Sequence, residues 1–586
     1  MSGFRERAAH EIRTASPAAT VTPIMRKLVD DSAAMLGRGP GDARQRAAAA
    51  RAYAIDHLEE LHAQIKGSFE RRGIGYHLAA TPEEAVDTVK RLLGSAKRVP
   101  KSKSMVAEEI GLTHALRAAG IDVLETDIGE YIVDIEGRGP SHITAPALHL
   151  NRARIRDLLA RGGADLPDDD PERLSRFVRD AVGAFFQDCD AAITGSNLLI
   201  ASSGRIGIVE NEGNVSLGVS HPKLHIVVTG YEKVVADEAA AFAVLEMLAP
   251  SATAQPLTAF THFLAGPAKG QQRHVVFVDN GRSRIAKEAR YRELLKCIRC
   301  GACMNACPVY RAAGGLSYGS PYMGPVGAVL SPLLWPDGRY ADLPFASSLC
   351  GRCSEICPVG IPLHRMLLDL RADAVSNGQV AGRIERAGWQ AWALMFTGAP
   401  VARAATAMAR LSLRGAGRMV RPHGDGDDPR LLPEPTPPRD PAMLWGAASG
   451  PPQLPSPTAT ATGDETATQE LVELFRARAI QLGVEVVEKV RKQKGDRMLK
   501  ATAAIASTGS VLLTGEATAR RPLLAASRVV LEVGAKTIVR YPSDLASRLG
   551  DGEALILTGA SRTADIEKQI VRGIHGAEAL VVVLKK

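Results

Sequence analysis

The stretch NLLIASSGRIGIVENEGN (197–214) decides the fold of the first half of the chain. Its apolar run is interrupted once by a Ser-Ser-Gly turn and ends at Glu, Asn and Gly, so it predicts two strands joined by a tight turn. The runs KLHIVVTG (223–230) and HVVFVDNG (274–281) have the same β-rich, glycine-ended character. Strands that alternate with helical patterns predict an α/β domain over residues 76–285.

Helix signals surround these strands. In TPEEAVDTVKRLL, Thr81 is placed to cap a helix, Pro82 to occupy its first turn and Glu84 to complete a capping box. Residues 1–75 have apolar side chains at three- and four-residue spacing, which predicts helices. The runs GIDVLETD and YIVDIEG (131–137) predict two further strands.

A second stretch repeats the opening pattern near the C-terminus. TAAIASTGSVLLTGEATAR (502–520) shares with it an Ile-Ala-Ser turn that ends in glycine and is followed by a strand, and each copy closes on a Val-rich strand. These features predict a degenerate duplication of one α/β fold on either side of a cysteine-rich segment. The second copy, over 468–586, is the shorter one.

Composition marks three segments between the copies. Residues 286–380 have little strand character and predict a helical domain around the cysteines. Residues 381–420 predict a helical extension, in which 387–413 is expected to form an amphipathic helix pair rather than a membrane contact. Eleven prolines fall within 422–457, so residues 421–467 predict a linker without a core.

Seven of the eight cysteines lie in two runs. The first run, CIRCGACMNACPVY, places Cys297, Cys300, Cys303 and Cys307 in a C-x2-C-x2-C-x3-C-P pattern. In this pattern three thiolates ligate one iron–sulfur cluster and the fourth ligates its neighbour. The charged N-terminus has no secretory signal pattern, so we expect a reducing, cytoplasmic setting, where clustered thiols indicate metal or redox chemistry.

The second run, SSLCGRCSEICPV (347–359), aligns with the last three cysteines of the first run, and Ser347 stands where a fourth cysteine would. The crossed pattern predicts two ligand sets: Cys297, Cys300, Cys303 and Cys357 for cluster 1, and Cys307, Cys350 and Cys353 for cluster 2. Cluster 1 is expected to be [4Fe–4S]. Cluster 2 is expected to be [3Fe–4S], or [4Fe–4S] with a fourth ligand from Ser347, solvent or a partner.

A structural zinc site is the alternative for these cysteines. Zinc favours two separate Cys-x2-Cys pairs, which two interlocked Cys-Pro runs do not form, so the pattern favours iron–sulfur clusters. Cys189 is isolated between a helix and a strand and is expected to be a small buried apolar residue.

The turn KSKSMVAEEIG (101–111) carries hydroxyl and ammonium groups between a short strand and a helix. Lys101, Ser102, Lys103 and Ser104 could bind a carboxylate or phosphate at the helix N-terminus. A solvated basic turn is the alternative. The ENEGN turn (210–214) also has two interpretations, as part of a binding site or as a tight turn alone.

Composition and missing motifs narrow the functional class. The net charge of +8 is spread over interspersed signs, which gives little support to nucleic-acid binding. The sequence has no G-x-G-x-x-G, Walker A or G-x-S-x-G motif and no run of 18 apolar residues, so we expect no integral membrane segment. Clusters without a hydride-accepting cofactor predict an electron relay rather than a complete dehydrogenase.

The chain resembles the lactate-utilisation iron–sulfur protein family, the B component of a three-part L-lactate oxidation system. The resemblance covers about residues 50–385. Its motifs include KSKSMVAEEIG, ETDIGEYIVDI, PSHITAPALHLNR, CIRCGACMNACPVYR and ASSLCGRCSEICPVGIPLH. The tail GASRTADIEKQIVRGIHGAEALVVVL (559–584) resembles the C component of the same system.

The resemblance implies sugar-isomerase- or CoA-transferase-like α/β domains and a role in electron transfer during oxidation of L-lactate to pyruvate. The implied partners are a cysteine-rich A component, a separate C component and an electron acceptor, in the cytoplasm or at the inner face of the membrane. An iron–sulfur subunit for another 2-hydroxy acid, such as glycolate, is one alternative. A redox sensor is the other, although the chain has no basic stripe for DNA.

Overall fold

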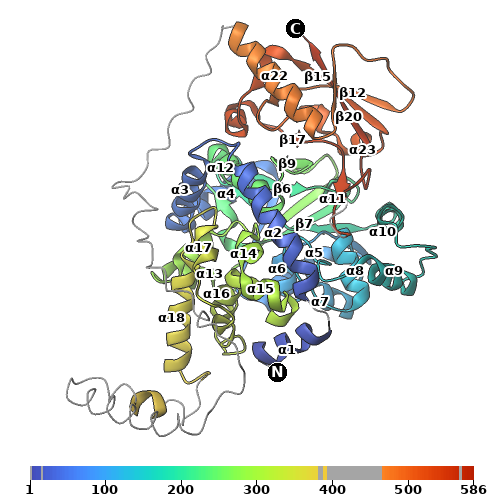
Figure 1. Ribbon diagram of the computed structural model, residues 1–586. Coiled ribbons are helices and arrows are strands. Elements are labelled where there is room, and N and C mark those ends of the chain that lie inside the picture. Colours follow the sequence, from blue (N-terminus) through green and yellow to red (C-terminus); the bar gives the residue numbers. More distant parts are fainter. Residues whose placement is uncertain (1–2, 15–16, 381–386, 392–464, 567–569, 586) are drawn as a thin grey trace, which may run out of the picture. The chain divides into compact units, whose positions relative to one another are not determined.

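The computed structural model describes residues 3–14, 17–380, 387–391, 465–566 and 570–585 (Figure 1). Contacts divide the chain into two units, of which the first combines residues 1–371 with 457–586 and the second is 372–456. Residues 387–391 are helical, but the rest of the predicted helix pair over 387–413 and most of the predicted linker over 421–467 lie outside the described residues. Every strand of the described chain belongs to the first unit.

The first unit begins with helices, in line with the three- and four-residue spacing of its apolar side chains. They are α1 Phe4–Thr14, α2 Pro17–Leu36, α3 Ala43–Asp56 and α4 Leu58–Arg72. Helix α4 ends at Gly73, whose left-handed backbone (φ 69°) turns the chain into the first strand.

A six-stranded, fully parallel sheet follows, with strand order β1-β10-β7-β4-β2-β3. Its strands are β1 Ile74–Ala79, β2 Arg98–Lys101, β3 Asp122–Glu125, β4 Ala191–Thr194, β7 Leu224–Gly230 and β10 Gln272–Val278. The helices of this region are α5 Pro82–Leu93, α6 Met105–Glu109, α7 Leu112–Ala118, α8 Ile128–Glu136, α9 Arg152–Arg161, α10 Pro171–Gln187, α11 Asn214–Ser220 and α12 Glu238–Thr253. Sheets of this kind are covered by helices, and their strands are correspondingly buried.

Local signals fix some of these helices. The Thr81 hydroxyl accepts from the Glu84 amide at 3.2 Å, which confirms the predicted N-cap of α5. The Glu84 carboxylate accepts from the amide of Ala80 (2.8 Å), one residue earlier than a capping box requires. The strand predicted for 131–137 is wrong, because the Asp127 side chain caps a helix by accepting from the Glu130 amide at 3.2 Å. The β-branched residues of that run suit a strand, but the cap and the burial of one helix face outweigh this preference.

The two copies of the repeat meet in one eight-stranded sheet, with strand order β16-β13-β14-β17-β9-β6-β5-β8. The first copy supplies β5 Leu198–Ile200, β6 Arg205–Glu210, β8 Val234–Val235 and β9 Phe260–Leu264. The second supplies β13 Ala503–Ile505, β14 Ser510–Thr514, β16 Ile538–Val539 and β17 Ala554–Leu557. The halves join where β17 pairs antiparallel with β9, so the strand order reads the same from either edge.

The repeated turn has the same conformation in both copies. Gly204 and Gly509 both have left-handed backbones (φ 66° and 67°), and each donates its amide to the residue four places earlier. A side chain at Gly509 would lie 2.5 Å from the Ala479 amide nitrogen, so only glycine fits this approach. The shared geometry bears out the repeat inferred from sequence.

The rest of the second copy is a parallel sheet with order β11-β20-β15-β12, which matches β1-β10-β7-β4 of the first. Its elements are α22 Glu465–Gln481, β11 Glu485–Val487, β12 Asp496–Lys500, α23 Arg520–Leu524, β15 Arg528–Gly534 and β20 Ala579–Lys585. A short ribbon of β18 Arg562–Thr563 and β19 Val571–Arg572 precedes the last strand. No counterpart of β2 and β3 occurs within its four-stranded sheet, which accounts for the shorter copy.

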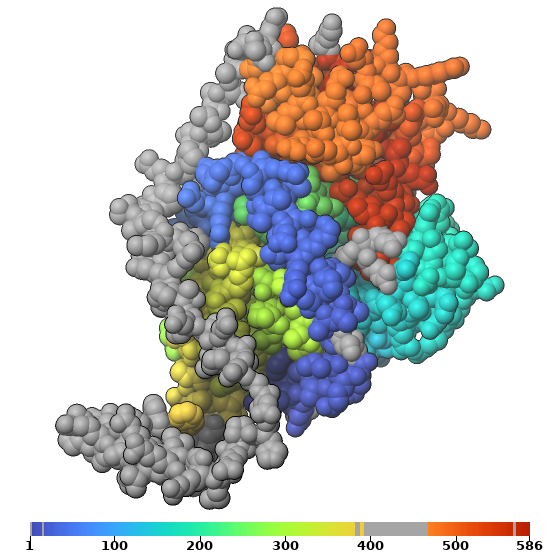
Figure 2. Space-filling model, in the orientation of Figure 1, coloured from blue at the N-terminus to red at the C-terminus, as the bar shows by residue number. Residues whose placement is uncertain are grey.

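The cysteine segment contains no strand anywhere in 286–380, all of which the structure describes. Its elements are η2 Arg292–Lys296, α14 Ala302–Ala306, α15 Pro308–Ala313, η3 Leu316–Tyr318, α16 Gly324–Leu334, η4 Leu343–Phe345, α17 Arg352–Glu355 and α18 Leu363–Ser376, preceded by α13 Arg282–Lys287. Helix α2 packs against α14 and α15, and Figure 2 shows the N-terminal helices beside this segment. One apolar core joins these helices, α12 and residues of the second copy such as Leu512 and Ile556.

Candidate metal centre and adjoining cavity

The two cysteine runs form a pair of matching loops. Arg299 and Leu349 have positive φ angles (60° and 57°), an uncommon state for such residues, and each directly precedes a cysteine. The glycines that follow those cysteines, Gly301 and Gly351, are also left-handed and begin α14 and α17. The backbone therefore curls in the same way around both positions.

Backbone amides point at the side chains of these loops. The Arg299 amide donates to Cys297 Sγ at 3.4 Å, and the Leu349 amide donates to Ser347 Oγ at 3.1 Å. The Ser347 oxygen thus occupies in the second loop the place that the Cys297 sulfur has in the first. Ser347 is half-buried, and the guanidinium of Arg371 donates to its carbonyl at 2.7 Å.

Thiols of the two runs act on one another's pKa values, and Cys303 is affected by Cys353 as well as by Cys357. Burial raises the pKa of the Cys300 thiol, and the neighbouring Cys297 and Cys357 raise it further. Burial also raises the pKa of Cys353, to about 11, and Cys307 is the next largest cause. Cys350 is a further neighbour of Cys353 and of Cys307. Metal binding is the usual means of keeping such thiols deprotonated.

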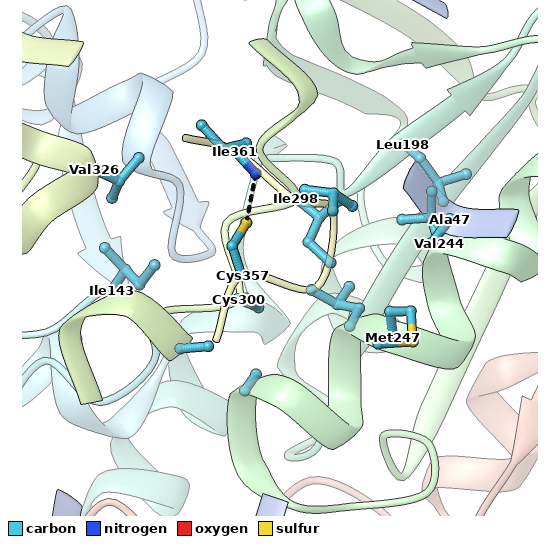
Figure 3. Packing of buried hydrophobic residues seen from close by; sticks show 14 of the residues in the cluster. Ala47, Ile143, Leu198, Val244, Met247, Ile298, Cys300, Val326, Cys357 and Ile361 are labelled. Carbon is cyan, nitrogen blue, oxygen red and sulfur yellow. Dashed lines mark hydrogen bonds between the residues drawn. The ribbon is translucent and has the colours of Figure 1, made fainter. Parts of the chain in front are cut away.

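Apolar side chains enclose the first group of thiols. Figure 3 shows Cys300 and Cys357 among Ile298, Ile361 and Val326, with the Ile361 amide donating to Cys357 Sγ at 3.4 Å. Amide donors and an apolar wall are what cluster sulfurs require, so these residues fit iron–sulfur clusters. When bound, such clusters accept and pass on single electrons.

Of the three cysteines predicted to hold cluster 2, one is exposed at the surface. Cys350 is exposed, whereas Cys307 and Cys353 are buried. Cys189 stands apart from both groups: it is half-buried, and its thiol donates to the Phe186 carbonyl at 3.3 Å. Burial raises the pKa of the Cys189 thiol to about 11, which agrees with an apolar packing role.

Arg51 of α3 connects the first cysteine loop to the α/β domain. Its buried guanidinium donates to the carbonyls of Glu232 (2.6 Å), Val234 (3.0 Å) and Leu295 (2.9 Å). It also donates to the carbonyl of Lys296, directly before Cys297, at 3.3 Å. Burial lowers the pKa of Arg51 to about 10, against opposing contributions from Glu232 and Cys297.

A cavity of about 1120 Å³ adjoins the first cysteine loop. The predicted KSKS turn reaches it with Ser102, Lys103 and Ser104, and Ser104 also caps α6 by accepting from the Ala107 amide. Lys101 is buried in an ion pair with Glu125 at 2.9 Å. Burial opposes the charge of Lys101, but Glu125 and Glu108 outweigh it and raise its pKa.

An acidic group forms another part of the cavity wall. Oxygens of Asp127, Glu212 and Asp565 lie within 4.8 Å of one another. The amides of Ile128 and Gly129, at the start of α8, donate to Glu212 (3.2 Å) and Asp565 (3.1 Å). Lys103 Nζ lies 3.4 Å from Asp127. A helix N-terminus and a lysine are the natural partners of these carboxylates, and the group joins the two copies of the repeat.

Several residues that line this cavity were not predicted from the sequence, among them three charged ones. They are Lys233, Arg299 and Asp565. Lys233 follows the end of a predicted strand, a position where ligand-binding residues gather in parallel sheets, so a signal for it existed. Arg299 stands between two cysteines of the first run, and Asp565 comes from the other copy, so nothing in their local sequence marked them.

The fold and the two cysteine loops define an iron–sulfur protein built on α/β domains, and family comparisons agree. The model of the LUD domain matches residues 62–285 and 497–584, and that of the 4Fe-4S dicluster domain matches residues 293–361. Lactate utilization protein B of Bacillus cytotoxicus is 41% identical over 371 residues, 62% of this chain and 78% of that protein. The chain belongs to the lactate utilization protein B family.

A second relative and one solved structure are also similar to parts of the chain. Lactate utilization protein B of Bacillus thuringiensis is 44% identical over 329 residues, 55% of this chain and 69% of that protein. A crystal structure of a duf162 family protein from Deinococcus radiodurans is 17% identical, with a TM-score of 0.22, and covers 38% of this chain and 98% of its own. Among the described residues, no helix is long and apolar enough to span a membrane.

Proposed function

We propose that this chain is the iron–sulfur electron-transfer component of a complex that oxidises L-lactate to pyruvate. The observation that carries the proposal is the joining of two cysteine loops to a LUD domain in which a cavity with charged residues on its wall adjoins the first loop. The names of the curated relatives support lactate as the substrate.

In this proposal, Cys297, Cys300, Cys303 and Cys357 hold a [4Fe–4S] cluster, cluster 1. Cluster 2 is held by Cys307, Cys350 and Cys353, with Ser347 as the fourth ligand. Cluster 1 lies beside the cavity, and cluster 2 reaches the surface at the exposed Cys350. Electrons from the substrate enter at cluster 1 and leave from cluster 2 to an acceptor.

The proposed partners are a cysteine-rich A component and a separate C component, and the proposed location is the cytoplasm, where thiolate-bound clusters are stable. The KSKS turn contributes to the substrate cavity through Ser102, Lys103 and Ser104. Lys101 stabilises the turn through its buried ion pair with Glu125.

Growth and spectroscopy test this function together. A deletion strain that lacks other lactate oxidases should fail to grow on L-lactate and recover with the wild-type gene, while growth on glycolate should be unchanged. Purified protein with its partner components should show L-lactate-dependent bleaching of the visible cluster absorbance. Undiminished growth on lactate without the gene would refute the proposal, and a selective defect on glycolate would favour a different 2-hydroxy acid.

A further inference from the structure

The cavity lies where the parallel sheet leaves a crevice. The chain runs outward from β2 to edge strand β3 and then returns past β2 to β4, so the strand order reverses between β2 and β4. The segments that leave the carboxyl ends of these strands, Ser102–Ser104 and Gly195–Asn197, both line the cavity. Open parallel sheets bind their ligands at such reversal points.

Two cationic groups reach this cavity without a full set of partners. Lys233, in the short helix η1 (Tyr231–Lys233) after β7, is only 6% exposed. Within the described residues its ammonium makes no hydrogen bond or ion pair, although the neighbouring Glu232 acts on its pKa. Arg299 lines the same cavity, and its Nη1 is buried without a hydrogen bond.

The nearby carboxylates are already occupied. Arg282 forms ion pairs with Glu109 and Glu232, both at 2.6 Å. On the side that faces the cavity, Glu232 makes one further contact, with Arg299 Nη2 at 3.3 Å. Burying a cation without a partner is costly. By contrast, Lys103 on the same cavity has Asp127 as its partner. Arg299 also stacks over the Tyr322 ring at 4.6 Å, so the donors left for an anion are the Lys233 ammonium and Arg299 Nη1.

We propose that Lys233 and Arg299 bind the carboxylate of a small 2-hydroxy or 2-oxo monocarboxylic acid beside cluster 1. Arg299 lies close enough to Lys233 to affect its pKa, and Cys297 affects the pKa of both cations. An acid held here would lie next to the first cluster. This inference deepens the proposed function, because it names the residues that would hold its substrate.

The second copy of the repeat offers a contrast. Its turn η6 (Ala535–Thr537) corresponds to η1, because each connects the last residue of a central strand to a two-residue strand of the eight-stranded sheet. Thr537 stands there in place of Lys233, and Lys536 is exposed. The anion site thus belongs to the copy that adjoins the cysteine loops.

Binding to the cluster-loaded full chain tests this proposal without partner proteins. Titration calorimetry under anaerobic conditions would compare L-lactate and pyruvate with acetate and inorganic phosphate. We expect L-lactate or pyruvate to bind one per chain and more tightly than acetate or phosphate. Lys233→Met should weaken that binding about tenfold or more, with iron content unchanged. Lys536→Met, the matched control, should bind as the wild type does.

Several results would overturn the proposal. They are absence of lactate and pyruvate binding to the wild type, equal affinity in Lys233→Met, or equal binding of acetate and phosphate. A Lys233→Met protein that alters only the cluster potential would show that Lys233 compensates cluster charge instead. None of these results would affect the growth test, so the proposed function can survive the loss of this inference.

Hydrogen exchange on the wild type keeps the test independent of the variant's folding. Saturating L-lactate should slow exchange in peptides that cover Tyr231–Val235 and 297–303. Protection confined to other regions of the chain would contradict the proposed site.

Discussion

At the scale of single residues, Ser347 is the position at which the two proposed clusters would differ. Its hydroxyl accepts an amide hydrogen bond in the same place where Cys297 does so in the first loop. A serine oxygen is a harder ligand than a thiolate and is protonated when free, so it binds iron less readily. The two clusters should therefore differ in stability and in potential, although seven of the eight ligand positions are cysteine.

Ser347→Cys should complete the second thiolate set. We expect the variant to retain at least as much iron per chain as the wild type and to show a changed EPR spectrum for one of the two clusters. Ser348→Cys, one residue along the same loop and exposed, is the control and should leave the spectrum unchanged. Identical iron content and spectra in Ser347→Cys and wild type would show that position 347 does not face the cluster.

At the scale of elements, Arg51 is the main polar link between α3, the η1–β8 turn and η2. Its guanidinium satisfies carbonyls from two segments that are far apart in sequence. Carbonyl groups at the ends of short helices are left unpaired by the helix itself, so an arginine that donates to several of them fixes both ends at once.

Arg51→Met should loosen the first cysteine loop. Loss of charged hydrogen bonds to buried carbonyls is expected to destabilise the first unit by roughly 3 kcal/mol. The thermal unfolding midpoint should fall, and the cluster absorbance should bleach faster in air.

Arg292→Met provides the comparison, because Arg292 lies on the same η2 but pairs with the exposed Asp56. Exposed pairs of this kind contribute about 0–1 kcal/mol, so its effect should be small. Equal effects of the two variants would contradict a special role for Arg51.

At the scale of the whole molecule, the second copy of the repeat completes the first. Strand β17 pairs with the edge of β9, and Arg562 and His575 donate backbone hydrogen bonds to the ENEGN turn. The His575 amide donates to the Glu212 carbonyl at 2.9 Å, and the Ser561 hydroxyl donates to the same carbonyl at 2.7 Å. The ENEGN turn is thus a junction between the copies as well as part of the cavity wall.

Gly213→Ala should open this junction. Gly213 has a φ of 93°, and a side chain there would lie 2.7 Å from the His575 carbonyl oxygen. Hydrogen exchange in 561–575 should become faster, and the thermal midpoint should fall.

Gly137→Ala separates backbone strain from the steric clash with His575. Gly137 has a comparable φ of 76°, but a side chain there would have no other atom within 4 Å. It should show only the backbone strain, about 1–2 kcal/mol, without opening the junction. A Gly213→Ala protein that behaves as Gly137→Ala does would mean that the segment adapts freely.

The sequence alone determined the local features of this protein. The spacing of the cysteines, the glycine-ended strands and the repeated Ile-Ala-Ser turn are all encoded within short windows, where backbone geometry follows from neighbouring residues. The N-cap at Thr81 was read correctly for this reason. The β-branched composition of 131–137 predicts a strand, but the Asp127 cap just before it starts helix α8 instead.

Only the tertiary structure decided how these features work together. It joined the two copies through β9 and β17, paired Lys101 with Glu125, and left Lys233 and Arg299 without full partners beside the cysteine loop. The energy of a buried charge depends on which groups lie within a few ångströms of it. Glu125 and Arg299 come from other segments than the lysines they lie near, so the local patterns around Lys101 and Lys233 did not distinguish the two.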